Sequence, residues 1–174
     1  MTKNKPPSRR VIARSAESDP RDLRTPPPTL AERAALAEKA NFGPYSKHKK
    51  NPSAYKLQPY AGEDEDPTYC DDDANLMPDD MKRAPELLVR GIQAGLFGDK
   101  TNKGDPSLLW TVDDNGWIYE ARITNPGYGG YHAYPVLRHE AIARKVLARY
   151  RDYVENADKP ELKASLKNAE SRYA

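Results

Sequence analysis

Residues 108–136 constrain the fold most strongly, because they carry the alternation and the turn signals of an antiparallel sheet. The run 108–112 is apolar, and Asp113-Asp114-Asn115-Gly116 follows it, with a glycine suited to the left-handed position of a bulged turn. The chain returns over 117–124, and a further strand-like stretch, 131–136, follows a second glycine-rich turn. The pattern predicts a hairpin with a third strand beside it.

Helical signals flank this sheet in the sequence. A T-x-x-E capping box begins at Thr29 and predicts a helix that ends near Ala40. Leucine and isoleucine recur at near-helical spacing over 87–96, and an amphipathic helix is expected over 139–155. A last helix is expected after Asp158. This order predicts the α+β class: a small antiparallel sheet of three or more strands, packed by helices.

Charge is sorted by position along the chain. Residues 1–56 hold 13 Lys and Arg against five Asp and Glu, whereas 57–80 hold nine acids and no base, although the formal net charge is only +2. The proline-rich stretch 1–28 has few apolar residues to bury, so a disordered basic arm is expected there. A single α+β domain is expected over 29–173: a helix, long loop and acidic stretch (29–80), a helix and the sheet (81–136), and the C-terminal helices (137–173).

Several function classes are disfavoured by the sequence. No apolar run approaches the ~18 residues that cross a bilayer, and no apolar segment follows the basic N-terminus, so a cytoplasmic protein without a membrane partner is expected. The glycine spacings of phosphate-binding loops are absent. Asp71-x-Asp73-x-Asn75 begins like a calcium loop, but Leu76 stands where glycine is needed. No metal or other cofactor is expected, and the single cysteine, Cys70, excludes an internal disulfide.

One candidate site lies on the expected sheet. Glu120, Arg122 and Thr124 share one face of their strand, and His132 would lie near them if its strand pairs antiparallel. These groups, with His48 as a further acid–base group, form the residue set of a small, toxin-like, metal-independent ribonuclease. The alternative is an ion-paired, solvated sheet face with no chemistry.

A second candidate site is the Tyr/Lys-rich segment between residues 45 and 56, where cations interleave with aromatic rings as a nucleic-acid strand requires. Its binding residues are expected to be Tyr45, Lys47, Lys49, Lys50 and Tyr55, together with Arg9 and Arg10 of the arm. Two other interpretations remain open: the segment neutralises the acidic stretch 63–80 of the same chain, or its tyrosines pack on the domain while its lysines stay solvated.

These observations favour a non-catalytic module that binds an acidic partner, nucleic acid or protein, through the basic arm and the Tyr/Lys-rich segment. The ribonuclease is the alternative, and a subunit of a larger assembly, with the proline-rich arm along a neighbour, is the third hypothesis. The sheet aromatics are assigned to the core beneath the helix that starts at His139: Trp110, Trp117, Tyr119, Tyr131 and Tyr134.

Overall fold

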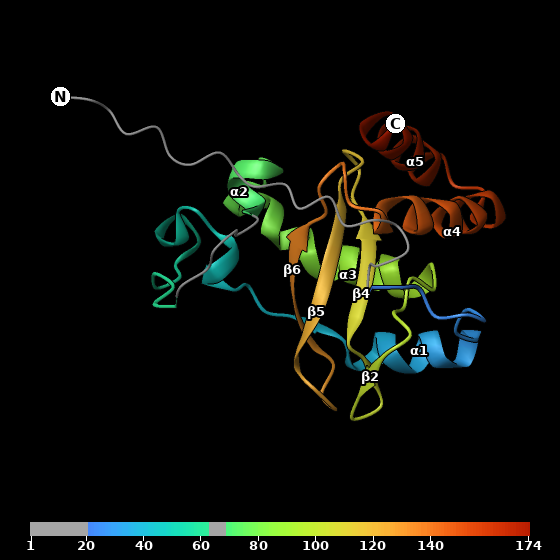
Figure 1. Ribbon diagram of the computed structural model, residues 1–174, viewed down its shortest axis with the longest axis horizontal. Helices are drawn as coiled ribbons and strands as arrows, with labels where there is room; N and C mark the ends of the chain where they lie inside the picture. Colours follow the sequence, from blue (N-terminus) through green and yellow to red (C-terminus); the bar gives the residue numbers. More distant parts are fainter. Residues whose placement is uncertain (1–20, 63–68) are drawn as a thin grey trace.

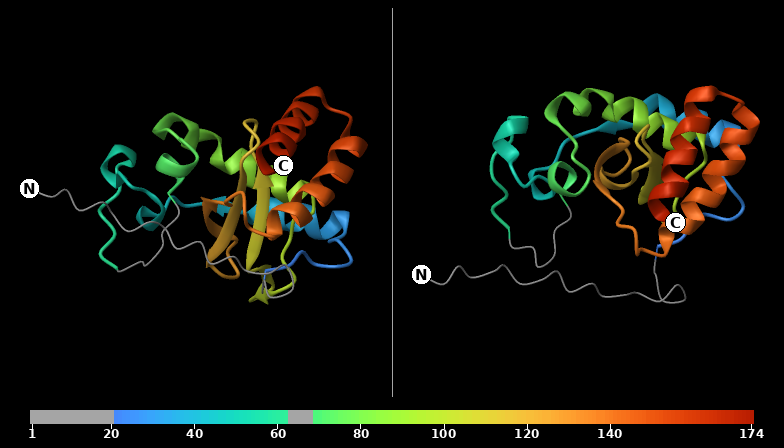
Figure 2. Two further views of the ribbon diagram at one scale, coloured as in Figure 1. Left: turned by 45° about the horizontal axis from the view of Figure 1, so that its top comes forward. Right: turned by 90° about the horizontal axis from the view of Figure 1, so that it is seen from above.

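The computed structural model describes residues 21–62 and 69–174, and it has the expected α+β class. Within these residues, five α-helices accompany a curled four-stranded sheet of order β1-β6-β5-β4. A separate two-stranded sheet joins β2 (Thr101–Asn102) to β3 (Asp105–Pro106). Figures 1 and 2 show α4 and α5 on one side of the strands, and the chain after α1 extending beyond β6 on the other side.

The predicted hairpin is confirmed. β4 (Leu108–Val112) and β5 (Ile118–Asn125) pair antiparallel, and Gly116 adopts a φ of 80° in the turn between them. β6 (Gly130–Pro135) is the predicted third strand, antiparallel to β5. A two-residue strand that the sequence did not reveal, β1 (Asn41–Phe42), pairs parallel with β6. The sheet is therefore mixed, and only its three long strands are antiparallel.

Different helices cover the two faces of the sheet. α1 (Leu30–Lys39) and α3 (Ala84–Gln93) pack on one face, where Leu88 and Ile92 of α3 form a buried cluster with Tyr131 of β6. The apolar spacing of α3 explains this packing, since residues four apart lie on the same side of a helix. On this face α3 packs mainly on β4 and β1.

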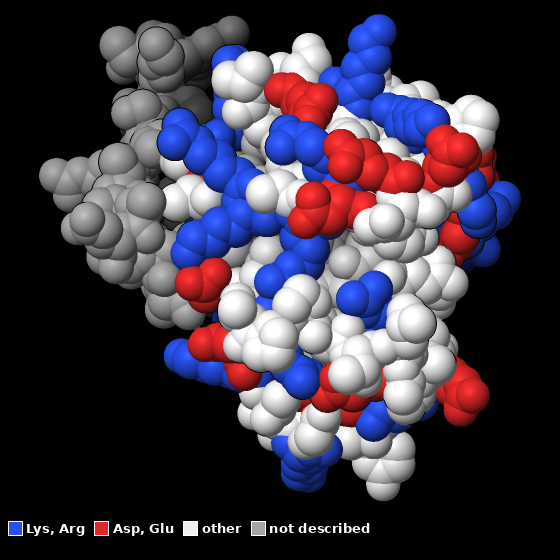
Figure 3. Space-filling model, turned by 90° about the vertical axis from the view of Figure 1, so that its right-hand side faces the viewer, with Lys and Arg blue, Asp and Glu red and all other residues white. Residues whose placement is uncertain are grey.

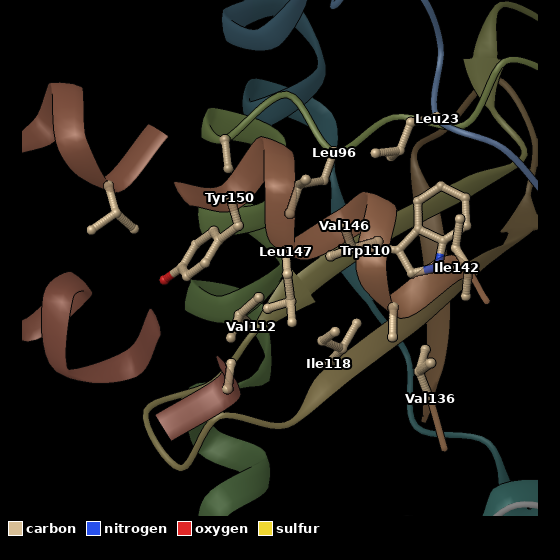
Figure 4. Packing of buried hydrophobic residues seen from close by; sticks show 14 of the residues in the cluster. Leu23, Leu96, Trp110, Val112, Ile118, Val136, Ile142, Val146, Leu147 and Tyr150 are labelled. Atoms are coloured by element: carbon tan, nitrogen blue, oxygen red, sulfur yellow. The ribbon is translucent and has the colours of Figure 1, made fainter. Parts of the chain in front are cut away.

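The opposite face is covered by a helix over only part of its area. α4 (Ile142–Ala157) places Ile142 and Val146 against Trp110 and Ile118, all of which are at most 1% exposed (Figure 4). Next to this apolar half, the same face continues into the polar side chains of β5 and β6. We call this remainder the polar half of the face.

α5 (Pro160–Tyr173) packs on α4 and contacts the turn end of the β4–β5 hairpin. The Tyr173 hydroxyl donates to the Val136 carbonyl at 2.8 Å and accepts from the Ile118 amide at 3.0 Å. A Cβ at Gly116 would lie 2.3 Å from the backbone of Ala169, so glycine is required in the turn both for its φ and for this approach.

The expected location of the sheet aromatics needs correction. Trp110 lies beneath α4 as expected, whereas Tyr131 packs with α1 and α3 on the opposite face. Trp117 contacts α5, with the Arg172 guanidinium 4.2 Å from the centre of its ring, and Tyr134 contacts His48. The cause is strand alternation, which sends consecutive side chains to opposite faces, so that neighbouring aromatics cannot all share one helix.

The segment before α1 also differs from expectation, because residues 21–28 are packed on the domain. Leu23 is 7% exposed within the α4 cluster, and it forms a bridge with Gly98. The capping box after it is confirmed, with the Glu32 amide bonded to the Thr29 hydroxyl. The expected unstructured arm is thus too long at its C-terminal end, and its other residues, 1–20, lie outside the described part of the chain.

The surface over the helices carries mixed charge. Figure 3 shows Lys and Arg interspersed with Asp and Glu on the side of the molecule that bears α4 and α5. Ion pairs connect Arg151 with Glu170 and Lys145 with Asp22 on this side. Such exposed pairs are screened by solvent and contribute little to stability.

Candidate nucleic-acid site

The polar half of the face is organised around a buried carboxylate. Glu120 is 0% exposed, and among the described residues it accepts hydrogen bonds from four side chains. The donors are Trp110 Nε1 at 3.1 Å, Arg21 Nη1 at 3.0 Å, Arg122 Nη2 at 3.3 Å and the Tyr134 hydroxyl. A buried carboxylate requires such compensation, because an unpaired charge away from water is very costly. The role that this geometry permits for Glu120 is to orient its donors.

Arg122 extends from the buried carboxylate toward solvent. Its side chain is 53% exposed, although one end of its guanidinium is held by Glu120 and by the Tyr134 hydroxyl oxygen at 3.0 Å. A guanidinium with a fixed plane and remaining N–H groups suits bidentate contact with phosphate. The ion pair thus presents a cation in one orientation at the edge of the polar half.

His132 lies directly opposite Arg122 in the β5–β6 register. Its Nδ1 is 3.1 Å from the Thr124 hydroxyl, and the residue is 8% exposed. Burial lowers the pKa of His132 to about 4, with a further contribution from the positive charges of Arg122 and Lys47. The imidazole is therefore neutral at pH 7.

His48 reaches the same place from a different part of the chain. It ends the 3-10 helix η1 (Ser46–His48), is 8% exposed, and stacks on His132 with ring centres 5.3 Å apart and planes 13° from parallel. Its ring also lies 4.7 Å from that of Tyr134. The structure thus brings together the four residues that the sequence singled out for catalysis: Glu120, Arg122, His132 and His48.

Tyr45 of the Tyr/Lys-rich segment contacts both histidine rings, and Tyr60, four residues beyond the segment, contacts Tyr45. The Tyr45 ring meets His132 edge-on at 5.0 Å and Tyr60 at 5.8 Å, and the two tyrosines are 37% and 36% exposed. Lys47 Nζ lies 5.8 Å from the centre of the Tyr60 ring. The two sites that the sequence treats as separate, one on the sheet and one on the segment, therefore share one surface. We call it the His–Tyr surface: Tyr45, Lys47, His48, Tyr60, Arg122, His132 and Tyr134.

The rest of the Tyr/Lys-rich segment faces its own chain. Lys50 pairs with Asp72 at 3.0 Å, and the backbone amides of Lys50 and Asn51 donate to the Asp71 carboxylate. Lys49 is 3% exposed, with its Nζ 5.2 Å from the Tyr55 ring. These contacts match the interpretation in which the segment neutralises the acidic stretch, so the segment divides into an outward half and an inward half.

Tyr55 belongs to the inward half. Its hydroxyl donates to the Leu76 carbonyl, and burial raises its pKa to about 12. Cys70 is buried nearby, and burial raises the pKa of its thiol, which keeps it protonated and unreactive. Arg9 and Arg10, the other predicted binding residues, lie outside the described residues.

Three residues that donate to Glu120 were not among the predicted site residues. Tyr134 lies two residues after His132 on the same strand, so strand alternation places both side chains on the same face. The alternation pattern could therefore have predicted Tyr134 as a site residue. Trp110 faces Glu120 across the hairpin, which the register also implies. Arg21 contacts Glu120 and, at 2.7 Å, Glu140; no local pattern predicts a contact across 99 residues.

A small cavity between α3 and the sheet is separate from this surface. It measures about 40 Å³, is mainly apolar, and is lined in part by Tyr119, whose hydroxyl has no hydrogen-bond partner among the described residues. The volume is enough for one or two water molecules.

The described ranges contain no group of three or more His, Cys, Asp or Glu side chains placed to hold a metal ion. None of the helices in these ranges is both long enough and apolar enough to span a membrane. The chain matches no protein-family model, and no curated protein or solved structure shows significant similarity to it.

Proposed function

We propose that this protein binds single-stranded RNA across the His–Tyr surface. The proposal depends on one observation: residues of the Tyr/Lys-rich segment lie next to residues of the sheet. His132 contacts the Tyr45 ring, lies opposite Arg122 in the sheet register, and is within the field of Lys47. A single strand needs cations for its phosphates and ring faces for its bases, and this surface offers both within one contact network.

Arg122 is the expected phosphate contact. Its guanidinium is already oriented by Glu120 and Tyr134, so little side-chain entropy is lost when a phosphate binds. A hydrogen bond to a charged group is worth about 1.5–3 kcal/mol, which corresponds to about a tenfold or greater change in affinity.

Tyr45 and Tyr60 are the expected base contacts. Each is more than a third exposed, and each is held by a ring neighbour that limits its rotation. Stacking of a base on an aromatic side chain is worth about 1–3 kcal/mol. The imidazoles and the Thr124 hydroxyl add donors and acceptors of the kind that read a 2′-hydroxyl. Lys49, Lys50 and Tyr55 are not part of the proposed contact, because they are engaged with the chain itself.

The test is fluorescence anisotropy with a labelled 2′-fluoro RNA strand, which no 2′-hydroxyl chemistry can cleave. Arg122→Gln is compared with Arg151→Gln, which removes an equal charge at a half-exposed position on α4. Tyr45→Ala is compared with Tyr128→Ala, an exposed tyrosine in the β5–β6 turn. Circular dichroism checks that each variant is folded.

We expect Arg122→Gln and Tyr45→Ala each to weaken binding about tenfold or more, while both control variants bind like the wild type. The logarithm of affinity should fall with the logarithm of salt concentration, and Arg122→Gln should reduce that slope by about 0.7, the value for one phosphate contact on a single strand. If the site variants and their controls bind equally well, the proposed surface is wrong.

A further inference from the structure

We propose that the His–Tyr surface also cleaves the RNA it binds, with His132 as general base, His48 as general acid and Arg122 holding the scissile phosphate. This inference rests on the proposed function, because the strand must bind before it reacts. It is carried by the stacked histidine pair, which simple RNA binding does not require.

The histidine pair supplies one base and one acid. Two imidazoles with ring centres 5.3 Å apart resist double protonation, because like charges this close repel each other. The coupled pair therefore has a singly protonated state in which one ring accepts a proton and the other donates one. A bound phosphate favours this state over the fully neutral pair, because its negative charge stabilises an imidazolium.

The surroundings assign the two roles. His132 lies opposite Arg122 in the sheet register and within the field of Lys47, and both cations favour its neutral form. Among the described residues its Nδ1 contacts the Thr124 hydroxyl, and in the tautomer whose Nδ1–H donates to that hydroxyl, Nε2 is the basic atom. His48, whose ring stacks on His132 and lies tilted against Tyr134, is left for the role of general acid.

Access to the pair requires one movement. Both histidines are 8% exposed, and the Tyr45 ring stands edge-on over His132. Tyr45 precedes η1 in extended backbone and is more than a third exposed, so its side chain can turn toward the strand and stack on a base. Binding through Tyr45 thereby opens the path to Nε2 of His132. Geometries in an unliganded site commonly tighten only when the substrate is bound.

The reaction is a transfer within the strand. The 2′-hydroxyl oxygen attacks the adjacent phosphorus, and its proton passes to His132. The bond from phosphorus to the 5′-oxygen breaks, and His48 protonates that oxygen. Arg122 neutralises the charge that develops on the non-bridging oxygens. The products are a 2′,3′-cyclic phosphate and a 5′-hydroxyl end; no electron is gained or lost, and water returns the two histidines to their starting protonation.

The test is incubation of a labelled single-stranded RNA with the protein in EDTA, with the products identified by mass spectrometry. His132→Ala and His48→Ala are compared with His139→Ala, which removes the third histidine at an exposed position outside the surface. His132→Asn is a second variant: it keeps a polar side chain and changes the side-chain volume less than His132→Ala does. Circular dichroism and binding of the 2′-fluoro strand report whether each variant is folded and competent to bind.

We expect the wild type and His139→Ala to cleave, and the His132 and His48 variants to lose about 10²- to 10⁴-fold in rate, far more than they lose in affinity for the 2′-fluoro strand. A strand with 2′-deoxyribose at the reacting position should bind and stay intact. If the wild type binds RNA but does not cleave it, or if cleavage survives in His132→Ala, the inference fails and the proposed function stands. If the wild type does not bind at all, both fall.

Discussion

Removal of the buried carboxylate tests the organisation of the site most directly. Glu120→Ala takes the acceptor away from two arginines, a tryptophan N–H and a tyrosine hydroxyl, at a position with 0% exposure. Arg21 is only 11% exposed, so its charge would remain in a largely buried location with Glu140 as its recorded carboxylate partner. Breaking a buried ion pair by removing one partner costs about 3–5 kcal/mol. We expect the free energy of unfolding to fall by about that amount.

The measurement is urea unfolding followed by circular dichroism, with Glu170→Ala as the matched control. Glu170 pairs with Arg151 on the helical surface and is 41% exposed, so its loss should change the free energy of unfolding little. The urea concentration at the midpoint of unfolding should fall, while the slope of the unfolding free energy against urea concentration stays constant. The slope is unchanged because the substitution hardly alters the surface area that unfolding exposes. If Glu120→Ala is no more destabilising than Glu170→Ala, the carboxylate does not organise this face, and the orientation argued for Arg122 loses its basis.

Three further predictions concern the elements that support the site. Leu23→Ala should destabilise the protein by about 2–5 kcal/mol, which thermal unfolding would show; a change below 0.5 kcal/mol, of about the size of surface substitutions, would mean that the segment before α1 is not part of the core. Tyr173→Phe removes a hydroxyl that joins two backbone groups of the sheet, so urea unfolding should show a loss of about 1–3 kcal/mol, and hydrogen exchange should quicken at the Ile118 amide. Asp105 is desolvated, but the Lys39 ammonium and the amides of Gly127 and Gly129 outweigh that burial and lower the pKa of its carboxyl. Its stabilising contribution is therefore present above the ordinary aspartate pKa and is lost as pH falls through the lowered one, so the difference in stability between wild type and Asp105→Asn should shrink on acidification; a constant difference would contradict the assignment.

The antiparallel part of the sheet could be predicted from the sequence because its determinants are local. The turn residues from Asp113 to Gly116 fix the hairpin, and the alternation along β5 places Glu120 and Arg122 on one face. Once β6 pairs antiparallel with β5, His132 must lie near Arg122, and the observed register puts them directly opposite. Proximity of these three residues therefore followed from pattern alone.

The remainder of the site depends on contacts that no local pattern encodes. His48 and Tyr45 lie in a stretch of short 3-10 turns that has no periodic pattern. The spacing of residues in the sequence therefore predicts neither which face of the sheet they cover nor how their rings are oriented. β1 has two residues, too few for an alternation to be detected. The arm was predicted to end just before Thr29, the first strong helix signal. An isolated leucine among prolines and charged residues, such as Leu23, gives no sign in the sequence that it is buried.

The double attachment of Arg21 has a practical consequence for anyone who shortens this protein. A polypeptide that starts at Thr29, where the sequence suggests the domain begins, would lack the guanidinium that joins Glu120 to Glu140 as well as the leucine that fills the gap beside Trp110. Such a fragment would leave Glu120 in the interior without one of the two cations that contact it among the described residues. We therefore expect a fragment that keeps Arg21 to be more stable than one that starts at Thr29.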